Sequence, residues 1–273
     1  MILGYAKAAA LGLALFTTGY RAPQDNVALA PSRVELRPTT AADAIDVPFG
    51  VGEKSTFEVR FGGLRVGSGS LAILGRENLR GREAYHMWFN VQGGVPFYRV
   101  DDVYESWIDA ATLNSLAFKR KIEEGSRERL QNFEISPEKG TYTERTPDDT
   151  IVKKTVDDPL DEGAFLYFIR TIPLEVGKTY DFHRYFIPNR NPVRIHVLRK
   201  ERVTVPAGTF NAIVIQPVIK TRGIFSENGR AEVWIADDPT RILLQLKSKL
   251  SFGSLNLYLK SYTPPTSQRA SRR

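Results

Sequence analysis

Apolar and polar residues alternate one by one through most of this chain, and that period of two constrains the fold more than any other feature. In the stretch TFEVRF, the side chains of Phe57, Val59 and Phe61 lie on one face of an extended backbone, while polar side chains occupy the other face. Residues 84–91 repeat the pattern with larger side chains. Strands of this kind bury one face and expose the other, which is typical of antiparallel sheets.

Turn-forming residues separate the alternating stretches at the spacing of an antiparallel meander. We predict hairpin turns at Gly62–Gly63, Glu124–Gly125 and Lys139–Gly140. The stretch VPAGTF predicts a further tight turn at residues 206–208, because proline fixes its own φ and glycine tolerates positive φ. The alternation changes parity across Gly67–Gly69, which indicates a β-bulge. The chain therefore predicts an all-β fold: a single large, strongly curved antiparallel sheet, or a partly open barrel, with one short helix.

The short helix is predicted over residues 160–171, where the apolar spacing becomes helical. Asp158 is the predicted N-cap, and Pro159 suits the first helical position. Two interpretations of this helix stay open. Its aromatic residues could line the mouth of the curved sheet, where apolar ligands bind in barrel-like folds, or they could fill the core. The residues concerned are Phe165, Tyr167 and Phe168.

The first residues have the layout of a secretory signal peptide. Lys7 precedes an apolar run at residues 8–16 that is too short to span a bilayer, which needs about 20 residues. The mature protein is then expected to be periplasmic or secreted, with no transmembrane span after signal removal. The predicted division is a signal peptide at 1–19 with cleavage as late as residue 30, a flexible arm at 20–47, a β-rich domain at 48–262 and a basic polar tail at 263–273.

Composition narrows the class of function. The chain lacks cysteine, which excludes disulfides, thiolate metal sites, cysteine nucleophiles and the lipid-modified cysteine of a bacterial lipoprotein. The net charge is +7, but Lys7 and three arginines after residue 263 lie outside the predicted domain. The domain itself is nearly balanced, so it lacks the strong basic face of a nucleic-acid-binding protein. We expect no nucleic-acid partner.

No arrangement of residues predicts catalysis or a cofactor. The three histidines, His86, His183 and His196, lack the spacing of a zinc site. His86 lies on the polar face of its strand and is predicted to be exposed there. Asp102 and Glu105 fall on opposite faces of one strand, so they do not form an acid–base pair. We therefore predict a protein that is not an enzyme and holds no metal or cofactor; a cell-wall or lipid hydrolase that uses Asp102 or His183 is the least favoured alternative.

One predicted hairpin, within residues 180–202, is both basic and aromatic. Between Arg184 and Arg202 it carries six Lys and Arg residues and a single acid, Glu201. Such a surface can hold lipid phosphate, lipopolysaccharide, a cell-wall glycan or an acidic protein. The alternative is a solvated hairpin whose charges prevent edge-to-edge aggregation. The candidate ligand-binding residues are Arg184, Arg190, Arg194, His196, Lys200, Phe182 and Phe186.

Five stretches, in this order along the chain, resemble a bacterial exported family known as domain of unknown function 3108. They are VPFGVGEKSTFEVRFGGLRVGSGSLAI, YRVDDVYESWID, FLYFIRTIPLEVGKTY, VPAGTFNAIVIQP and GRAEVWIADDPTRILLQLKSKLSFGSLNLYL, and together they extend from Pro48 to Tyr262. The resemblance implies an exported envelope protein of Gram-negative bacteria with a strongly curved antiparallel sheet. It implies no established activity, cofactor or catalytic residue. At the level of fold it extends, by analogy, to the half-barrel lipoprotein carriers of the periplasm.

These observations predict an exported periplasmic or envelope protein that binds an amphiphilic or anionic envelope component without catalysis. Lipid, lipopolysaccharide and cell-wall glycan are the candidate ligands. The alternative is a scaffold or accessory subunit of an envelope system, which acts only through contacts with another envelope protein.

Overall fold

The computed structural model describes residues 46–95, 98–220, 231–250 and 253–267. The predicted signal peptide, nearly all of the predicted arm and the end of the predicted tail lie outside these ranges, so the predictions made for them remain predictions. The helical segments within these ranges fall short of the length and apolarity that a membrane crossing requires.

Strands dominate the described residues, and all of them pair antiparallel within one sheet. They are β1 (Lys54–Phe61), β2 (Leu64–Leu79), β3 (Arg82–Val95), β4 (Tyr98–Asp109), β5 (Ser115–Glu124), β6 (Arg127–Ser136), β7 (Thr141–Arg145), β8 (Thr150–Lys154), β9 (Thr179–Phe182), β10 (Val193–Val205), β11 (Gly208–Val218), β12 (Glu232–Ala236), β13 (Leu243–Leu250) and β14 (Gly253–Thr263). The helical elements are α1 (Glu162–Phe168) and two short 3-10 turns, Pro137–Lys139 and Pro188–Arg190. The predicted all-β class with one short helix is confirmed.

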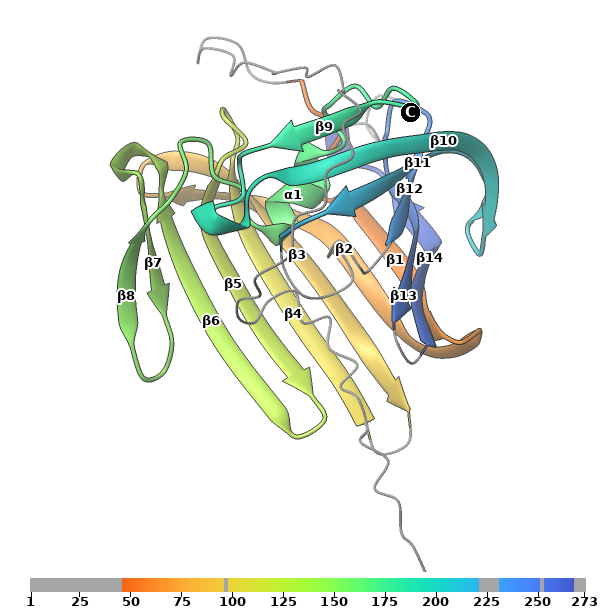
Figure 1. Ribbon diagram of the computed structural model, residues 1–273, viewed down its shortest axis with the longest axis horizontal. Coiled ribbons are helices and arrows are strands. Elements are labelled where there is room, and N and C mark those ends of the chain that lie inside the picture. The colour runs from red at the N-terminus through yellow and green to blue at the C-terminus, as the bar shows by residue number, and fades with distance from the viewer. Residues whose placement is uncertain (1–45, 96–97, 221–230, 251–252, 268–273) are drawn as a thin grey trace, which may run out of the picture.

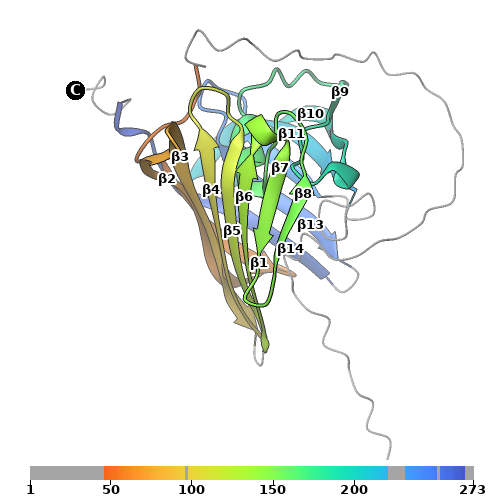
Figure 2. The ribbon, with the colours of Figure 1, turned by 90° about the vertical axis from the view of Figure 1, so that its left-hand side faces the viewer.

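The sheet is a meander whose first and last strands meet in its middle. The strand order runs from β8 through β7, β6, β5, β4, β3 and β2 to β1, and then from β14 through β13, β12, β11 and β10 to β9. The two edges are therefore β8 and β9, and the described strands do not close the sheet between them. Figures 1 and 2 show that the sheet curves around α1, with β3 and β4 on one side of the helix and β10 and β11 on the other.

Helix α1 begins later than the sequence predicts. Its N-cap is Asp161, not Asp158, because the Asp161 side chain accepts hydrogen bonds from the backbone N–H groups two and three residues further on. The preceding chain is extended, since Leu160 pairs with Tyr185 in an isolated parallel bridge. That bridge holds the connection between the two edge strands against the chain that follows β9.

The helix packs closely against β3 and β4 through its smallest residue. A methyl group at Gly163 would clash with Met87 of β3 and Ser106 of β4, so glycine permits the approach. Tyr167 is 1% exposed and packs edge-on against Phe49, with ring centroids 4.8 Å apart. These contacts hold the helix at a fixed distance from the inner face of the sheet.

The predicted turns are confirmed, and a bulge is present one residue before the predicted glycine step. Strands β5 and β6 join at Gly125, and β6 and β7 join at Gly140, each glycine having a φ of +61°. Strands β10 and β11 form the hairpin predicted at residues 206–208. The bulge between β1 and β2 places Val66 as the extra residue, directly before Gly67. Local turn chemistry in the sequence therefore sets the order and register of the meander.

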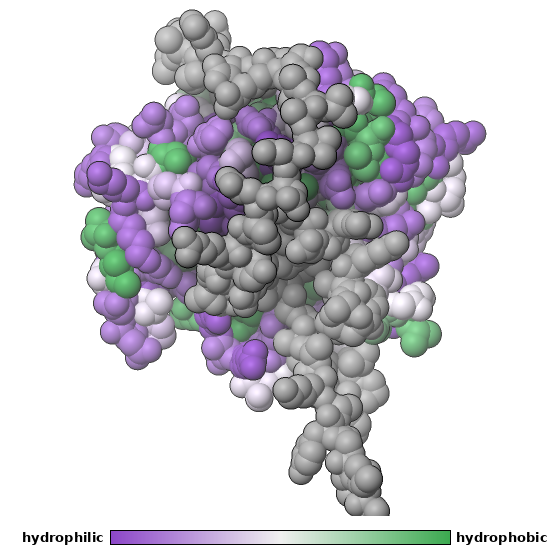
Figure 3. Space-filling model, viewed as in Figure 1, coloured by the Kyte–Doolittle hydropathy of each residue, from purple (hydrophilic) through white to green (hydrophobic). Residues whose placement is uncertain are grey.

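The outer surface is mostly hydrophilic where Figure 3 shows described residues, and its hydrophobic residues are scattered. The most exposed large hydrophobic residues are Leu64 and Val152, which lie on strands far apart in the sheet order. Buried hydrophobic side chains instead form one large cluster that spans nearly all of the strands. The main apolar feature of the described residues is therefore the inside of the curved sheet.

Candidate functional site: an apolar cavity beside the helix

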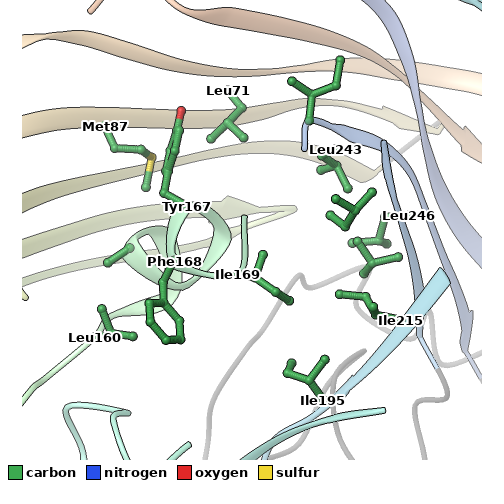
Figure 4. Packing of buried hydrophobic residues seen from close by; sticks show 14 of the residues in the cluster. Leu71, Met87, Leu160, Tyr167, Phe168, Ile169, Ile195, Ile215, Leu243 and Leu246 are labelled. Carbon is green, nitrogen blue, oxygen red and sulfur yellow. The ribbon is translucent and has the colours of Figure 1, made fainter. Parts of the chain in front are cut away.

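An apolar cavity lies between α1 and the inner face of the sheet. Its volume is about 110 Å³, measured as the space open to the centre of a water molecule. One water needs roughly 10–15 Å³ by that measure, so the cavity has room for part of a small ligand. Figure 4 shows the helix on one side of this space and strands of the second half of the sheet on the other. The side chains that face each other there are Ile169, Ile195, Ile215 and Leu246.

Helix α1 is apolar on two faces: one lines the cavity and the other packs in the core. Phe165, Leu166 and Ile169 follow one another at helical spacing and line the cavity. Tyr167 and Phe168 point away from it and pack in the core, where Phe168 meets Phe182 edge-on at 5.1 Å between ring centroids. Of the two interpretations of the aromatic residues, the structure thus supports the cavity for Phe165 and the core for Tyr167 and Phe168.

The opposite wall follows from the period of two in β10. Val193 and Ile195 are fully buried and line the cavity. Arg194 and His196 alternate with them and point outward. This alternation is the one that the sequence predicts, and it separates the apolar wall from the charged outer face of the same strand.

Six residues bring polar atoms to the otherwise apolar wall. They are Glu53, Ser55, Tyr104, Glu162, Arg170 and Tyr185. Two of the six are carboxylates, and each is paired with an arginine, but the two pairs differ in how completely their hydrogen bonds are made.

The first pair joins Glu53 to Arg170 in a two-point salt bridge. Arg170 Nη1 donates to Glu53 Oε1 at 2.6 Å, and Nη2 donates to Oε2 at 3.1 Å. Arg170 Nη2 also donates to the carbonyl oxygens of Pro48 and Thr240. Tyr262 adds a longer hydrogen bond, from its hydroxyl to Glu53 Oε2 at 3.4 Å. Both oxygens of the Glu53 carboxylate are therefore satisfied, and the pair ties the end of α1 to β1 and to the turn before β13.

The second pair joins Glu162 to Arg120 and leaves one carboxylate oxygen over. The Tyr185 hydroxyl donates to Glu162 Oε1 at 2.6 Å, and Arg120 Nη1 donates to the same oxygen at 3.4 Å. Glu162 Oε2 is buried and receives no hydrogen bond from the part of the chain that the structure describes. Arg120 donates in addition to Gln131, at 2.8 Å. Burial, reinforced by the Glu162 charge, holds the pKa of the Tyr185 hydroxyl well above its usual range, so this group stays a donor.

Of the buried carboxyl groups outside the cavity lining, two have a pKa raised to about 7. Burial raises the pKa of Asp161 to about 7, although Ser106 Oγ donates to it at 2.5 Å. Burial and the neighbouring carboxyl of Glu124 raise the pKa of Asp102 to about 7. As predicted, Asp102 lies on the opposite face from Glu105, whose carboxylate bonds to His86 on the outer face.

Three of the seven predicted ligand-binding residues are built into the protein interior. Phe182 and Phe186 belong to the hydrophobic core. Arg184 is half-buried: its guanidinium donates to the Asp158 carbonyl at 2.9 Å and to Asn114 Oδ1 at 2.8 Å. The guanidinium also lies over the ring of Phe168, 4.6 Å from its centroid. These contacts fix the chain around α1.

The other four contact different partners, of which only Tyr185, the partner of Arg190, is buried. Arg194 forms a two-point salt bridge with Asp181, at 2.7 and 2.9 Å. Lys200 pairs with Asp237 at 2.8 Å, and His196 Nδ1 bonds to Thr179. Arg190 lies over the Tyr185 ring. The structure therefore does not bring the seven residues together around one ligand site.

Neither His183 nor His86 lies with Asp102 in an arrangement suited to hydrolysis. His183 is exposed, and neither it nor Asp102 lines the cavity. The sequence predicts an exposed His86, but the structure gives it close partners. Its ring stacks on Trp107, with centroids 4.5 Å apart, and its two nitrogens lie 2.7 and 2.8 Å from the carboxylates of Glu77 and Glu105. Within the described residues, no cluster of His, Asp and Glu could hold a metal ion.

Sequence reasoning missed both carboxylate–arginine pairs. One signal was present: Glu162 precedes Phe165, Leu166 and Ile169 by three, four and seven residues, which places all four on one face of the helix. A second apolar face on a short helix indicates that this face also packs against, or lines, an apolar space. The acid at the start of that face indicates where the space has a polar group. No local pattern could reveal the pair of Glu53 and Arg170, because more than a hundred residues separate them.

The fold and cavity define a class of β-barrel-like proteins in which an open antiparallel sheet curves around a helix and a small apolar space. The family model described as "Protein of unknown function (DUF3108)" matches residues 56–260, and the chain belongs to that family. This agrees with the resemblance in the sequence. A comparison with curated proteins finds no match.

Among solved structures, the chain is similar in fold to a β-barrel-like protein of domain of unknown function DUF1849 from Brucella abortus. The TM-score is 0.51 at 10% identity, over 80% of this chain and 99% of that one. A protein described as a lipoprotein, from Parabacteroides distasonis, gives 0.37 at 10% identity over 81% of this chain and 100% of its own. A protein described as exported, from Bacteroides fragilis, gives 0.30 at 12% identity over the same shares. The likeness to the Brucella abortus protein is a likeness of fold.

Proposed function

We propose that this protein is an exported envelope protein that binds the apolar part of an amphiphilic molecule in the cavity beside α1, without catalysis. The observation that carries the proposal is the cavity itself: an apolar space with a few convergent polar groups that lies between a helix and a curved sheet. Export rests on the signal-peptide layout of the first residues.

The chemistry of the wall favours a hydrocarbon chain over a sugar. Each CH₂ group that moves from water into such a wall contributes about 0.8 kcal/mol. Each sugar hydroxyl would lose its water and find few partners among Ile195, Ile215 and Leu246, which costs free energy. Among the candidate envelope components, this favours a molecule with a lipid tail over a cell-wall glycan.

The cavity also favours binding over hydrolysis. The residues considered for a hydrolase, Asp102 and His183, are not part of its lining. The carboxylates that do line it, Glu53 and Glu162, are engaged with arginines.

Native mass spectrometry of the full chain, produced in a bacterial periplasm, tests the proposal together with analysis of an organic extract of the same sample. We expect a stoichiometric adduct with a hydrocarbon tail. An Ile195→Trp variant, which fills the cavity from β10, should lose the adduct. Leu198→Trp, on the same strand but partly exposed, is the matched control and should keep it.

Circular dichroism on both variants checks that the fold is retained. If Ile195→Trp folds and carries the same adduct as the original chain, the ligand does not occupy the cavity. If the chain carries no adduct and takes up none from added envelope lipids, the binding function itself is contradicted.

A further inference from the structure

We infer that the cavity selects an uncharged amphiphile with an O–H or N–H donor, and that Glu162 Oε2 accepts the hydrogen bond of this donor. A long-chain alcohol is the simplest member of the class. The inference rests on the proposed function, and it goes further by naming the chemistry of the ligand's polar end.

The first argument is the incomplete hydrogen bonding of Glu162. Its side chain is 8% exposed and lines the cavity, and its Oε2 receives no donor from the described residues, whereas its Oε1 receives two. A buried carboxylate oxygen without a donor destabilises the protein, so it calls for an explanation, and a further binding partner supplies one. A donor on the ligand would complete the set.

The second argument is the charge around the cavity. Arg170 is the only cation among the described lining residues. Glu53 and two backbone carbonyls engage its Nη atoms, and its Nε is buried without an acceptor among those residues. An anionic head group at the Glu162 end of the cavity would meet a carboxylate oxygen that lacks a donor, and is disfavoured there. A cationic head group is also disfavoured, because Arg120 already balances the charge of Glu162 and a further buried charge would be unpaired.

The third argument is the direction of the helix. Glu162 lies at the start of α1, and Ile169 directly follows its last residue. At about 1.5 Å per residue, these positions are roughly 10 Å apart along the axis. A ligand whose donor reaches Glu162 would therefore lay its tail along Leu166 and Ile169, facing Ile195 and Leu246. The polar end and the apolar wall are arranged as an amphiphile requires.

The test compares three probes of equal chain length on the full chain: 1-dodecanol, dodecanoate and dodecyl methyl ether. Binding is measured by displacement of an apolar fluorescent dye. The ether is the more hydrophobic probe and lacks the donor, so a purely apolar site prefers it over the alcohol. If Glu162 accepts the donor, we expect the alcohol to bind about tenfold tighter, or more, than either other probe.

A Glu162→Gln variant tests the assignment of the residue. Its amide can donate to a carboxylate and carries no charge, so the preference for dodecanol over dodecanoate should disappear. Glu144→Gln is the matched control, because Glu144 accepts from Gln131 in the same chain of hydrogen bonds but does not line the cavity. It should keep the preference of the original chain.

The outcomes separate the two proposals. If the ether or dodecanoate binds the original chain as tightly as dodecanol, the inference about the donor is overturned, while binding in the cavity stands. The inference is overturned in the same way if Glu162→Gln folds and keeps the preference. If none of the three probes binds, the proposed function fails as well. The comparison of alcohol with ether needs no variant, so it decides even if Glu162→Gln does not fold.

Discussion

The side chains of Glu53 and Glu162 both lie on the wall of one cavity, and both face an arginine. Only the Glu53 carboxylate has a hydrogen-bond donor for each of its oxygens. Glu53 uses both oxygens, with Arg170 and Tyr262 as donors. Glu162 uses one oxygen and leaves the other without a donor among the described residues. The difference separates a carboxylate whose two oxygens are both satisfied by its own chain from one that leaves an oxygen for a partner.

The largest effect on stability is expected at the ion pair of Glu53 and Arg170. Arg170→Met leaves Glu53 buried and uncompensated, so the free energy of unfolding should fall by about 3–5 kcal/mol. Urea unfolding measures it. The double change Glu53→Met with Arg170→Met removes both charges and should recover much of the loss. If the double variant is as unstable as the sum of the two single variants, the two groups do not act as a pair.

A smaller effect is expected where the helix meets the sheet. Gly163→Ala forces Met87 and Ser106 aside and should reduce the free energy of unfolding by about 1–3 kcal/mol. It should also weaken ligand binding, because α1 positions Glu162. Gly75→Ala is the matched control: it has open space around it, so its cost should be within about 0.5 kcal/mol. Equal stability of the two variants would contradict the close packing of α1.

A pH dependence of stability is expected from the buried carboxyl group at the N-cap of α1. Burial raises the pKa of Asp161 from its ordinary 3.8 to about 7, so between these values the folded state binds a proton that the unfolded state releases. This contribution to stability is therefore complete below pH 3.8 and is lost as the pH rises through 7.

An Asp161→Asn variant removes that titration and keeps the capping oxygen. Within the window, its unfolding free energy should fall less with rising pH than that of the original chain, by at most about 1.4 kcal/mol per pH unit. Urea unfolding at several pH values between 4 and 8 provides the comparison. Parallel pH profiles for the two proteins would show that Asp161 keeps its charge when buried.

The smallest effect is expected at the basic outer face of β10. Arg194 and Lys200 pair with acids on the surface, so replacing both with alanine should cost about 0–1 kcal/mol per pair. Binding of dodecanol should not change. A clear loss of binding would move the ligand site from the cavity to the hairpin that the sequence first indicated.

The fold was predictable because its determinants are local. The alternation around Phe57, the turn glycines at 125 and 140, and the parity change near Gly67 each depend on a few neighbouring residues. The sequence places the N-cap three residues too early, because Asp158, followed by Pro159, is at least as good a cap in sequence as Asp161. The choice between them is made by tertiary contacts: Ser106 and Ser115 hold Asp161, and Leu160 is drawn into a bridge.

The candidate site was not predictable in the same way, because it depends on which face of α1 packs opposite which strands of the sheet. Charge density drew attention to the hairpin at residues 180–202. The strand alternation turns the basic side chains of β10 outward, whereas Arg184 and the aromatic side chains are built into the interior. The cavity forms between α1 and strands more than twenty residues away in sequence. A single acid on an apolar helix face is a weak signal until the opposite wall is known.

A crystal structure of the protein with 1-dodecanol tests the central claim most directly. The account predicts the alkyl chain between Ile169 and Ile195, with the hydroxyl oxygen within hydrogen-bonding distance of Glu162 Oε2. Alcohol bound with its hydroxyl at the Glu53–Arg170 pair, or found only on the outer face of β10, would contradict it.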